Sequence, residues 1–594
     1  MVFSSAFQNC FGKVETSELR LVDRSGYEVS SLLYKPDSAT VYDPAPCIIT
    51  IEGWFNNKEM QDLYSVEYAR RGYVVIAVDM HGHGDSESTN SNFLYSSAVG
   101  VDAAVELAGT LPFVDQSKIA LTGHSSGGAA ADMAMAIDNE RAVPLISAVF
   151  YEASTWVDDT GVDHMDDFNG RSAGIIADKY DEFFFWTTDE SGNDVGPREF
   201  LNSWEAKRFV SSGSFDYVTG NSSVEPGKYY GNPNSLRVIY QPSMTHPWVH
   251  FSSKSVGYGI EFFEKVFGAP NPISPRNQIW QFKVLFNFIG LLGVIFFSLA
   301  FMSRMLETSY FGVLKAKNGV KPLKIYKTSD YLWFLVPLIL CSAFSPLCFY
   351  FCIDKVYGIT TKYFTQNGPL LMGLWSLISG LFCLILLIIY YYAYGKKNGF
   401  SLTQKGVQIS GTKLCRTIVL ALLTTSLMFL ILFFADFFFK TDFRIWVLTL
   451  KAFGPDKVVL GLKYLPFFLV FYIINSIAVN SFNYNNIGGE KGNTFLLATA
   501  NVLGLIVFEL IQYITFISTG LLKWYSTEGY RISGIWLFPA IIYLFITPFL
   551  TRFIYKKTNN PYLSGIVNAI IITMMCVANT TTILGGAAVV ASNY

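Results

Sequence analysis

The second half of the sequence contains eight long apolar segments, which restrict the possible folds more than any other feature. Each segment is close to the ~20 residues that a helix needs to cross the hydrocarbon core of a bilayer. A segment surrounded by lipid must satisfy its own backbone hydrogen bonds, and a helix does so without a partner segment. We therefore predict an all-α, multi-pass membrane domain over residues 276–594, with the lipid bilayer as its partner. The predicted helices cover residues 284–302, 331–352, 369–393, 417–439, 458–481, 494–517, 534–550 and 562–582.

Residues 1–275 differ in composition and form the first predicted domain. They contain all six histidines and charges of both signs, whereas the whole chain is 51% hydrophobic and only 15% charged. The sequence contains no basic run interleaved with aromatic residues, which is the pattern that would indicate a nucleic-acid partner. Only Cys10 and Cys47 precede the apolar segments, so the sequence does not indicate a disulfide framework.

Short apolar runs alternate with helical patterns in this first domain. Residues 18–22 and 27–32 are predicted to form a hairpin, because a turn containing glycine separates two runs of alternating character. Strands bounded by helices at such spacing indicate a mostly parallel sheet with helices on both faces. The other strands are expected at residues 47–51, 73–79, 118–122, 146–151, 174–177 and 236–240, with helices at 58–71 and 102–109.

The sequence Gly123-His124-Ser125-Ser126-Gly127 lies between a predicted strand and an alanine-rich predicted helix. Gly-x-Ser-x-Gly in this position is typical of the sharp strand-to-helix turn that presents a nucleophilic serine. The glycines leave room where a Cβ would crowd the neighbouring strand and helix. Ser125 is therefore the candidate nucleophile, and the Ser126 amide at the helix start is a candidate donor to an oxyanion.

With this turn, residues 14–270 resemble the α/β-hydrolase family. The resemblance also includes the loop at residues 79–86 after a central strand, an acid after a later strand and a histidine that comes last. Serine, acid and histidine follow one another in the order that this family uses. The resemblance implies an α/β-hydrolase fold and an esterase-like or lipase-like serine hydrolase, without a cofactor or a metal ion.

The resemblance implies the catalytic triad Ser125, Asp181 and His246. Asp181 lies a few residues after the strand at 174–177, and His246 follows the last strand. Asp178 is the alternative acid and His250 is the alternative base. Serine is a weak nucleophile, so a neutral imidazole must accept its proton while a carboxylate fixes the ring tautomer.

The second oxyanion donor is expected in the loop after the strand at 47–51. The family usually has His-Gly followed by the donor residue here, and this chain has Glu52-Gly53-Trp54. The Trp54 amide is therefore the predicted partner of the Ser126 amide. Glu52 departs from the family pattern, which leaves the details of this wall of the site open.

Other groups of residues have two interpretations. The histidines and Asp85 of residues 81–85 fit a zinc site, but a turn fixed by glycines and histidine hydrogen bonds is the preferred interpretation. The insertion between Asp181 and His246, with a predicted helix at 197–210, is expected to cap the cleft. Within it, the aromatic residues 183–186 line an acyl pocket or pack in the core.

The orientation follows from the positive charges near the ends of the apolar segments. The loops after the first, third, fifth and seventh segments carry fifteen lysines and arginines, and the loops after the second, fourth and sixth carry eight. The richer side is predicted to be cytoplasmic, which places the first domain and Tyr594 on the outer face of the cell membrane. Because an exported domain needs a signal, we expect a hydrophobic anchor upstream of Met1; an inverted topology is the alternative.

Glu509 lies near the middle of the sixth apolar segment, with Gln512 and Tyr513 on the same helical face. A carboxylate in this position is a candidate functional residue, and a protonated structural glutamate is the alternative. Two classes of function follow from the whole sequence. The first is a membrane-bound hydrolase of an ester, thioester or amide with a small-molecule or lipidic acyl substrate, or an acyltransferase or exopeptidase that uses the same triad. The second is a transport or envelope-assembly protein whose hydrolase-like domain only binds.

Overall fold

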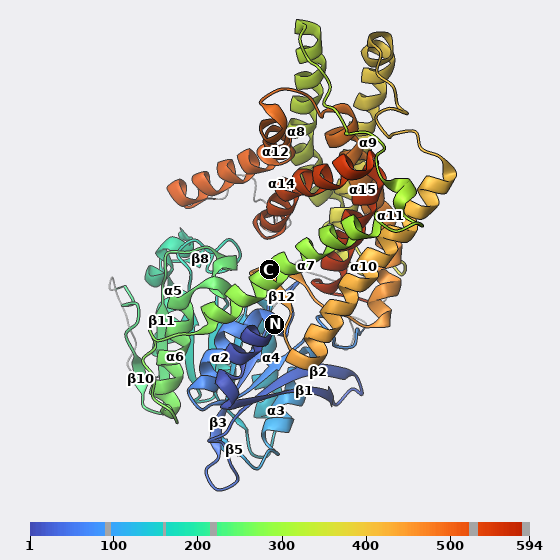
Figure 1. The fold of residues 1–594 in the computed structure, drawn as a ribbon. Coiled ribbons are helices and arrows are strands. Elements are labelled where there is room, and N and C mark those ends of the chain that lie inside the picture. Colours follow the sequence, from blue (N-terminus) through green and yellow to red (C-terminus); the bar gives the residue numbers. More distant parts are fainter. Residues whose placement is uncertain (90–96, 158–161, 214–222, 522–530, 532, 585–594) are drawn as a thin grey trace.

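The computed structural model describes residues 1–89, 97–157, 162–213, 223–521, 531 and 533–584. It consists of a sheet domain, which ends with α6 (Ser253–Phe267), and a helical domain, which begins with α7 (Trp280–Met305). Figure 1 shows the sheet domain in blue and green below the long helices of the second half. The two domains meet at one face.

The sheet domain contains nine strands in the order β1-β2-β4-β3-β5-β6-β7-β11-β10. The strands from β4 to β11 run parallel, whereas β1, β2 and β10 pair antiparallel at the two edges. The mostly parallel sheet predicted from the sequence is confirmed. Its strands are β1 (Val14–Val22), β2 (Glu28–Pro36), β3 (Ala45–Ile51), β4 (Val74–Val78), β5 (Val114–His124), β6 (Ile146–Glu152), β7 (Ser172–Ile176), β10 (Tyr230–Asn232) and β11 (Ser235–Tyr240).

Helices cover both faces of this sheet, as central strands without an exposed face require. One apolar core lies under α3 (Val101–Ala108), α4 (Ser126–Asn139) and α5 (Trp204–Ser211), and the other lies under α2 (Asp62–Arg70) and α6. The helix expected at 197–210 is divided at Ser203, whose hydroxyl caps α5 by accepting the Ala206 amide at 3.0 Å. A 3₁₀ turn, Pro197–Asn202, precedes this cap.

The helical domain has eight helices that are long and apolar enough to cross a membrane, which confirms the predicted number among the described residues. After α7 they are α8 (Thr328–Val356), α9 (Asn367–Tyr390), α10 (Gly411–Phe439), α11 (Pro455–Ser476), α12 (Gly489–Thr519), α14 (Ser533–Thr558) and α15 (Pro561–Ala578). Two features differ from the sequence prediction. A short hairpin, β12 (Phe443–Ile445) and β13 (Leu448–Leu450), lies between α10 and α11. The last helix ends at Ala578, after which the chain continues without helical structure into the contact with the sheet domain.

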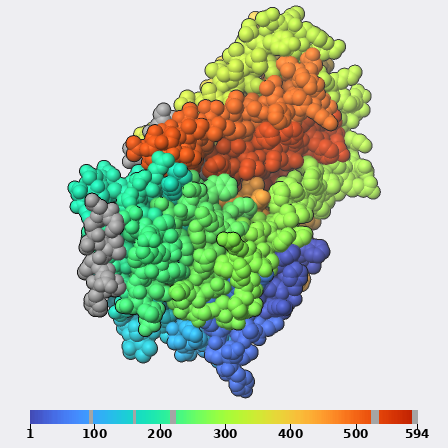
Figure 2. Space-filling model, turned by 90° about the vertical axis from the view of Figure 1, so that its left-hand side faces the viewer, coloured from blue at the N-terminus to red at the C-terminus, as the bar shows by residue number. Residues whose placement is uncertain are grey.

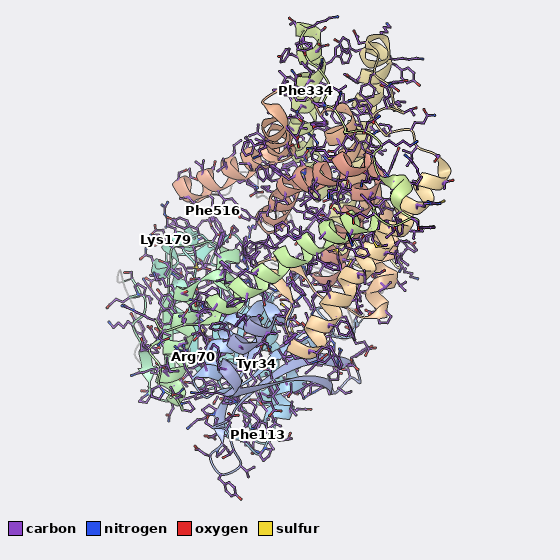
Figure 3. All side chains as sticks on the ribbon, viewed as in Figure 1. Tyr34, Arg70, Phe113, Lys179, Phe334 and Phe516 are labelled. Atoms are coloured by element: carbon purple, nitrogen blue, oxygen red, sulfur yellow. The ribbon has the colours of Figure 1, made fainter. Side chains whose placement is uncertain are left out.

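The helical domain contacts the sheet domain at the carboxyl ends of the parallel strands. Its C-terminal segment donates the Thr582 amide to the carbonyl of Gly82, which follows β4, at 2.9 Å. The orange and red C-terminal helices lie directly above the sheet domain in Figure 2. In Figure 3, Phe516 of α12 lies close to Lys179 of the sheet domain, whereas Phe334 of α8 lies at the far end of the molecule. The edge of the sheet where α/β proteins bind their ligands is therefore covered by helices.

Candidate active site

Ser125 lies in a strained turn between β5 and α4. Its backbone has φ 55° and ψ −122°, a conformation that residues with a Cβ rarely adopt. A Cβ on Gly123 would lie 2.2 Å from the carbonyl oxygen of Gly127, and one on Gly127 would lie 2.6 Å from the carbonyl oxygen of Ile51. Both glycines are thus required by the close approach of β3, β5 and α4, and the strain presents the serine side chain at the end of the sheet.

The loops after β7 and β11 bring Asp181 and His246 together. Asp181 Oδ2 lies 2.9 Å from His246 Nδ1. The other carboxylate oxygen, Oδ1, accepts the amides of Phe183 at 2.7 Å and Phe184 at 2.8 Å. These bonds hold the carboxylate in place, and the carboxylate in turn selects the tautomer with hydrogen on Nδ1 and leaves Nε2 as the basic nitrogen. Ser125 and His246 line one cavity of about 40 Å³, which we call the catalytic cavity.

The alternative acid, Asp178, has a different environment. It is fully buried, and neither of its carboxylate oxygens has a hydrogen-bond partner among the residues that the structure describes. Burial, together with the nearby charges of Asp181 and Glu182, raises the pKa of Asp178 well above its usual value. This shift favours the neutral form of Asp178, and the structure pairs His246 with Asp181 instead.

Two further histidines lie beside His246. The rings of His124 and His250 are 3.7 Å apart between centroids, and His124 lies 4.6 Å from His246. Burial, and then the neighbouring histidines, lowers the pKa of His124 well below its usual value, and burial with His246 lowers the pKa of His250 to about 3. Both rings are therefore uncharged, the His124 ring contacts those of His246 and His250, and both residues line the catalytic cavity.

The predicted oxyanion wall lies next to the serine. A Cβ on Gly53 would lie 2.6 Å from His124 Nδ1 and 3.2 Å from Ser125 Cβ, so the loop after β3 touches the nucleophile turn. Trp54, which follows, lines the catalytic cavity. Ser126 is the first residue of α4, where a helical amide has no carbonyl one turn earlier to donate to.

Glu52, the residue at which the chain departs from the family pattern, has a structural role. It is fully buried, and its Oε1 accepts the Met80 amide at 2.7 Å. Burial and the charge of Asp79 raise its pKa well above the usual value, so the side chain is neutral. Glu52 thus joins the loop after β3 to the loop after β4.

The helical domain completes the wall of the catalytic cavity. Tyr357 after α8, Val447 in the β12–β13 hairpin and Ile535 of α14 all line it. Trp446 of the hairpin donates its indole N–H to the carbonyl of Pro247, next to the candidate base, at 3.0 Å. The sequence predicted a cap from the insertion between Asp181 and His246, but the residues named here come from the helical domain.

The aromatic residues at 183–186 were predicted to line an acyl pocket or to pack in the core, and different residues of this group occupy these two kinds of position. Phe183 lines the catalytic cavity, with its ring 4.9 Å from that of His246. Phe185 is buried against Phe200, at 4.8 Å between ring centroids. Trp186 stacks on Phe516 of α12 at 6.2 Å, so the insertion also contacts the helical domain.

Buried charges join the loop after β4 to the β12–β13 hairpin. Lys451 Nζ lies 3.0 Å from both Glu59 Oε1 and Asp85 Oδ2. Lys58 lies 2.6 Å from Asp79 and 3.6 Å from Asp85. Burial by itself would raise the pKa of Glu59, but Lys451 and Lys58 lower it to about 2. Sequence reasoning missed this cluster; its signal was the concentration of lysines and arginines in the short segment between α10 and α11.

The histidines of residues 81–85 contribute to the same contact. His81 Nε2 lies 2.8 Å from Asp23, and His83 Nε2 lies 2.8 Å from the Thr581 hydroxyl of the C-terminal segment. Among the described residues, no group of three or more histidines, cysteines and acids is arranged to hold a metal ion. The hydrogen bonds of the two histidines agree with the turn interpretation of this loop.

Glu182 connects the candidate base to α12. Its Oε2 accepts the backbone amide of His246 at 2.8 Å, and its Oε1 accepts the hydroxyl of Tyr513 at 2.8 Å. Burial, with the charge of Asp181, raises the pKa of Glu182 to about 7. Glu509 is buried one helical turn before Tyr513. The polar face of α12 that the sequence singled out thus reaches the site through Tyr513.

Comparison with known proteins identifies the fold of the first domain. Residues 51–254 match the model of the alpha/beta hydrolase family. Among curated proteins, none matches the chain. A hypothetical protein from Pseudomonas aeruginosa is 26% identical over 24% of this chain and 44% of its own, with a TM-score of 0.22, so the chain spans less than half of its length. Esterases from Pyrococcus furiosus and Pyrobaculum calidifontis are each 14% identical with TM-scores of 0.29; the matches cover 42% and 45% of this chain, and 91% and 90% of theirs.

Proposed function

We propose that this chain, whose sheet domain is an α/β-hydrolase domain, is a serine hydrolase that cleaves an ester, thioester or amide through an acyl-enzyme. One observation carries the proposal. Ser125, in a strained turn, and His246, held 2.9 Å from Asp181, line the same cavity. A nucleophile, a base and a carboxylate that orients the base are the parts that this chemistry requires.

The mechanism follows from the positions of these groups. Ser125 Oγ attacks the substrate carbonyl carbon while His246 Nε2 accepts the hydroxyl proton. The resulting oxyanion accepts hydrogen bonds from the Ser126 and Trp54 amides, each contributing about 3 kcal/mol in the transition state. His246 then gives its proton to the leaving alcohol, thiol or amine as the carbonyl re-forms. Water, deprotonated by His246, attacks the acyl-enzyme and releases the acid and Ser125.

A fluorophosphonate tests this proposal, because an activated serine attacks its phosphorus much faster than other hydroxyls do. We expect one labelled residue, Ser125, and loss of labelling and of ester cleavage in Ser125→Ala. His246→Ala should abolish labelling, whereas His250→Ala should retain most of it. Ester cleavage that survives in Ser125→Ala would contradict the proposal and favour a domain that only binds.

A second candidate function uses the same acyl-enzyme. The helical domain lines the catalytic cavity through Tyr357, Val447 and Ile535, which favours an acceptor that arrives from the membrane over bulk water. The chain would then be an acyltransferase. Product analysis with a lipid alcohol present separates the two: a new ester indicates transfer, and free acid alone indicates hydrolysis.

The proposed location is the cell membrane, with the sheet domain on the outer face. Eight apolar helices support a multi-pass protein, and the excess of positive charge supports the orientation. Cysteines introduced between Arg304 and Lys327 should be shielded from an impermeant reagent in intact cells. Labelling of this loop from outside would reverse the orientation. A cysteine at Asn593 should instead be accessible to this reagent; Asn593 lies outside the described residues.

A further inference from the structure

The catalytic cavity adjoins the first of two neighbouring cavities inside the helical domain. The first helical cavity, of about 130 Å³, shares four lining residues with the catalytic cavity: Phe55, Asn56, Val447 and Ile535. The second helical cavity, of about 60 Å³, shares Leu448, Tyr543 and Met575 with the first. The three cavities therefore follow one another from Ser125 into the space between the helices.

The chemistry of the walls changes along this path. Near Ser125 the wall contains the rings of His246 and His250. The first helical cavity has Arg444 and Asn56 among its polar residues, but Arg444 is already held by Asp442 at 2.7 Å and by Asn57 at 2.7 Å. The remaining lining comes mainly from aromatic and aliphatic side chains of α9, α11, α14 and α15. The second helical cavity contains no charged side chain among its lining residues in the described part of the chain.

We propose that these two cavities bind the acyl chain of a lipid ester whose carbonyl carbon lies at Ser125. The proposal rests on the proposed function and names its substrate class. A row of adjacent, mainly apolar cavities behind a nucleophile suits a substrate part that is long, uncharged and flexible, which describes a fatty-acyl chain. A polar acyl group would lose its hydration there without gaining partners.

The sizes of the cavities set the expected chain length. A cavity of about 150 Å³ in another protein binds a six-carbon ring. The first helical cavity, at about 130 Å³, therefore holds roughly six carbons of the chain. On the same scale the second helical cavity, at about 60 Å³, holds roughly three more carbons, so an octanoyl chain fills the first cavity and a decanoyl chain extends into the second. Each methylene that leaves water contributes to binding, so the preference should rise with chain length until the second cavity is full.

Two substitutions, each of which places a large side chain in one helical cavity, test whether the acyl chain fills the first cavity before it reaches the second. Ala540→Trp places an indole in the first helical cavity, and Ser298→Phe places a ring in the second. The matched control is Ala343→Trp, at an exposed position of α8. The full-length chain in detergent is assayed with acetyl, octanoyl and decanoyl esters of one chromogenic alcohol. Labelling of Ser125 by a small fluorophosphonate reports whether each variant keeps an intact site.

We expect Ala540→Trp to lower kcat/KM for the octanoyl and decanoyl esters by at least about tenfold, the equivalent of two buried methylenes. The acetyl ester and the labelling rate should stay within about twofold of the unmodified chain, because the catalytic cavity is unchanged. Ser298→Phe should affect only the decanoyl ester, and Ala343→Trp should affect none of them.

The outcomes separate the two proposals. If the unmodified chain neither reacts with the fluorophosphonate nor cleaves the acetyl ester, both the proposed function and the acyl-chain site are wrong. If Ser125 is labelled and the acetyl ester is cleaved, but Ala540→Trp leaves the chain-length profile unchanged or lowers all esters equally, only the acyl-chain site is overturned.

Discussion

The sheet domain and the helical domain place large apolar side chains in opposite ways. In the sheet domain, residues such as Ile48 and Val75 are fully buried in the central strands. In the helical domain, Phe296, Ile339 and Phe438 are each more than 60% exposed. A water-soluble surface rarely carries large apolar patches, so these exposed side chains indicate lipid contact. The same hydrophobic effect explains both arrangements: large apolar side chains point inward where water surrounds the domain and outward where lipid surrounds it.

The contact between the domains differs from both arrangements, because charged side chains are buried there. There, Lys58, Glu59 and Lys451 are buried in a cluster of charges. Charged groups taken out of water need partners in good geometry, and here each domain supplies partners for the other. The contact is therefore specific in position, and it holds the carboxyl ends of the strands, with Ser125 and His246, against the helices.

The largest expected effect concerns the sheet domain alone. Asp181→Asn should lower kcat by about 10⁴-fold, because the amide favours the wrong tautomer of His246 while the fold stays intact. Asp178→Asn, next to the site but neutral and without a bond to His246, should change kcat by less than about threefold. Steady-state kinetics on an acetyl ester measures both. Equal losses would mean that the base is oriented differently from the structure.

The second effect tests the contact. Lys451→Met removes the nearer partner of Glu59 and Asp85 and leaves them Lys58, at 3.6 Å from each; breaking a buried pair costs about 3–5 kcal/mol. We expect a lower temperature of unfolding, measured by fluorescence in detergent. Lys228→Met, which removes an exposed pair with Glu225, is the control and should leave the unfolding temperature nearly unchanged. Adding Glu59→Gln to Lys451→Met should recover part of the loss; two equally small effects would show that the domains do not depend on this cluster.

The third effect depends on pH. Burial raises the pKa of Glu152, beside the nucleophile turn, to about 8, while its Oε1 accepts the Thr122 hydroxyl at 2.6 Å. Since the folded state holds this proton more tightly than the unfolded state, the free energy of unfolding should fall as pH rises from about 4.5 to 8. Glu152→Gln, which resembles the neutral acid, should raise the unfolding temperature at pH above 8 by several degrees, at about 2–4 °C per kcal/mol.

At low pH, the variant and the unmodified chain should unfold at nearly the same temperature. Thermal unfolding measured between pH 5 and pH 9 gives the comparison. A constant difference at every pH would mean that Glu152 is ionised throughout this range.

The smallest effect concerns the link between α12 and the base. Tyr513→Phe removes the hydrogen bond to Glu182, which accepts the His246 amide, and one such bond is worth about 1 kcal/mol. We expect kcat to fall about fivefold with KM nearly unchanged, because the bond positions the histidine and does not contact substrate. Tyr392→Phe, at an exposed position after α9, is the control. A change in KM alone would assign Tyr513 to substrate binding.

Several features were accessible from the sequence because each has a local signature. The continuous apolar runs of β3 and β4 predicted buried central strands, and Gly-x-Ser-x-Gly predicted the turn at Ser125. Chain order placed Asp181 and His246 after later strands, and the structure brings these two side chains to 2.9 Å. Helix ends were less accurate: the predicted last helix continued to residue 582, whereas α15 ends at Ala578.

By itself, the sequence determined a mostly parallel sheet followed by eight apolar helices, because short-range periodicity and segment length carry that information. Only the tertiary structure decided which surface covers the catalytic cavity. Tyr513 and Glu182 are 331 residues apart in the chain, and Lys451 and Glu59 are 392 apart. No local pattern encodes such pairs, since they form only when two separately folded surfaces fit together. The cavities that lead from Ser125 into the helices belong to that fit.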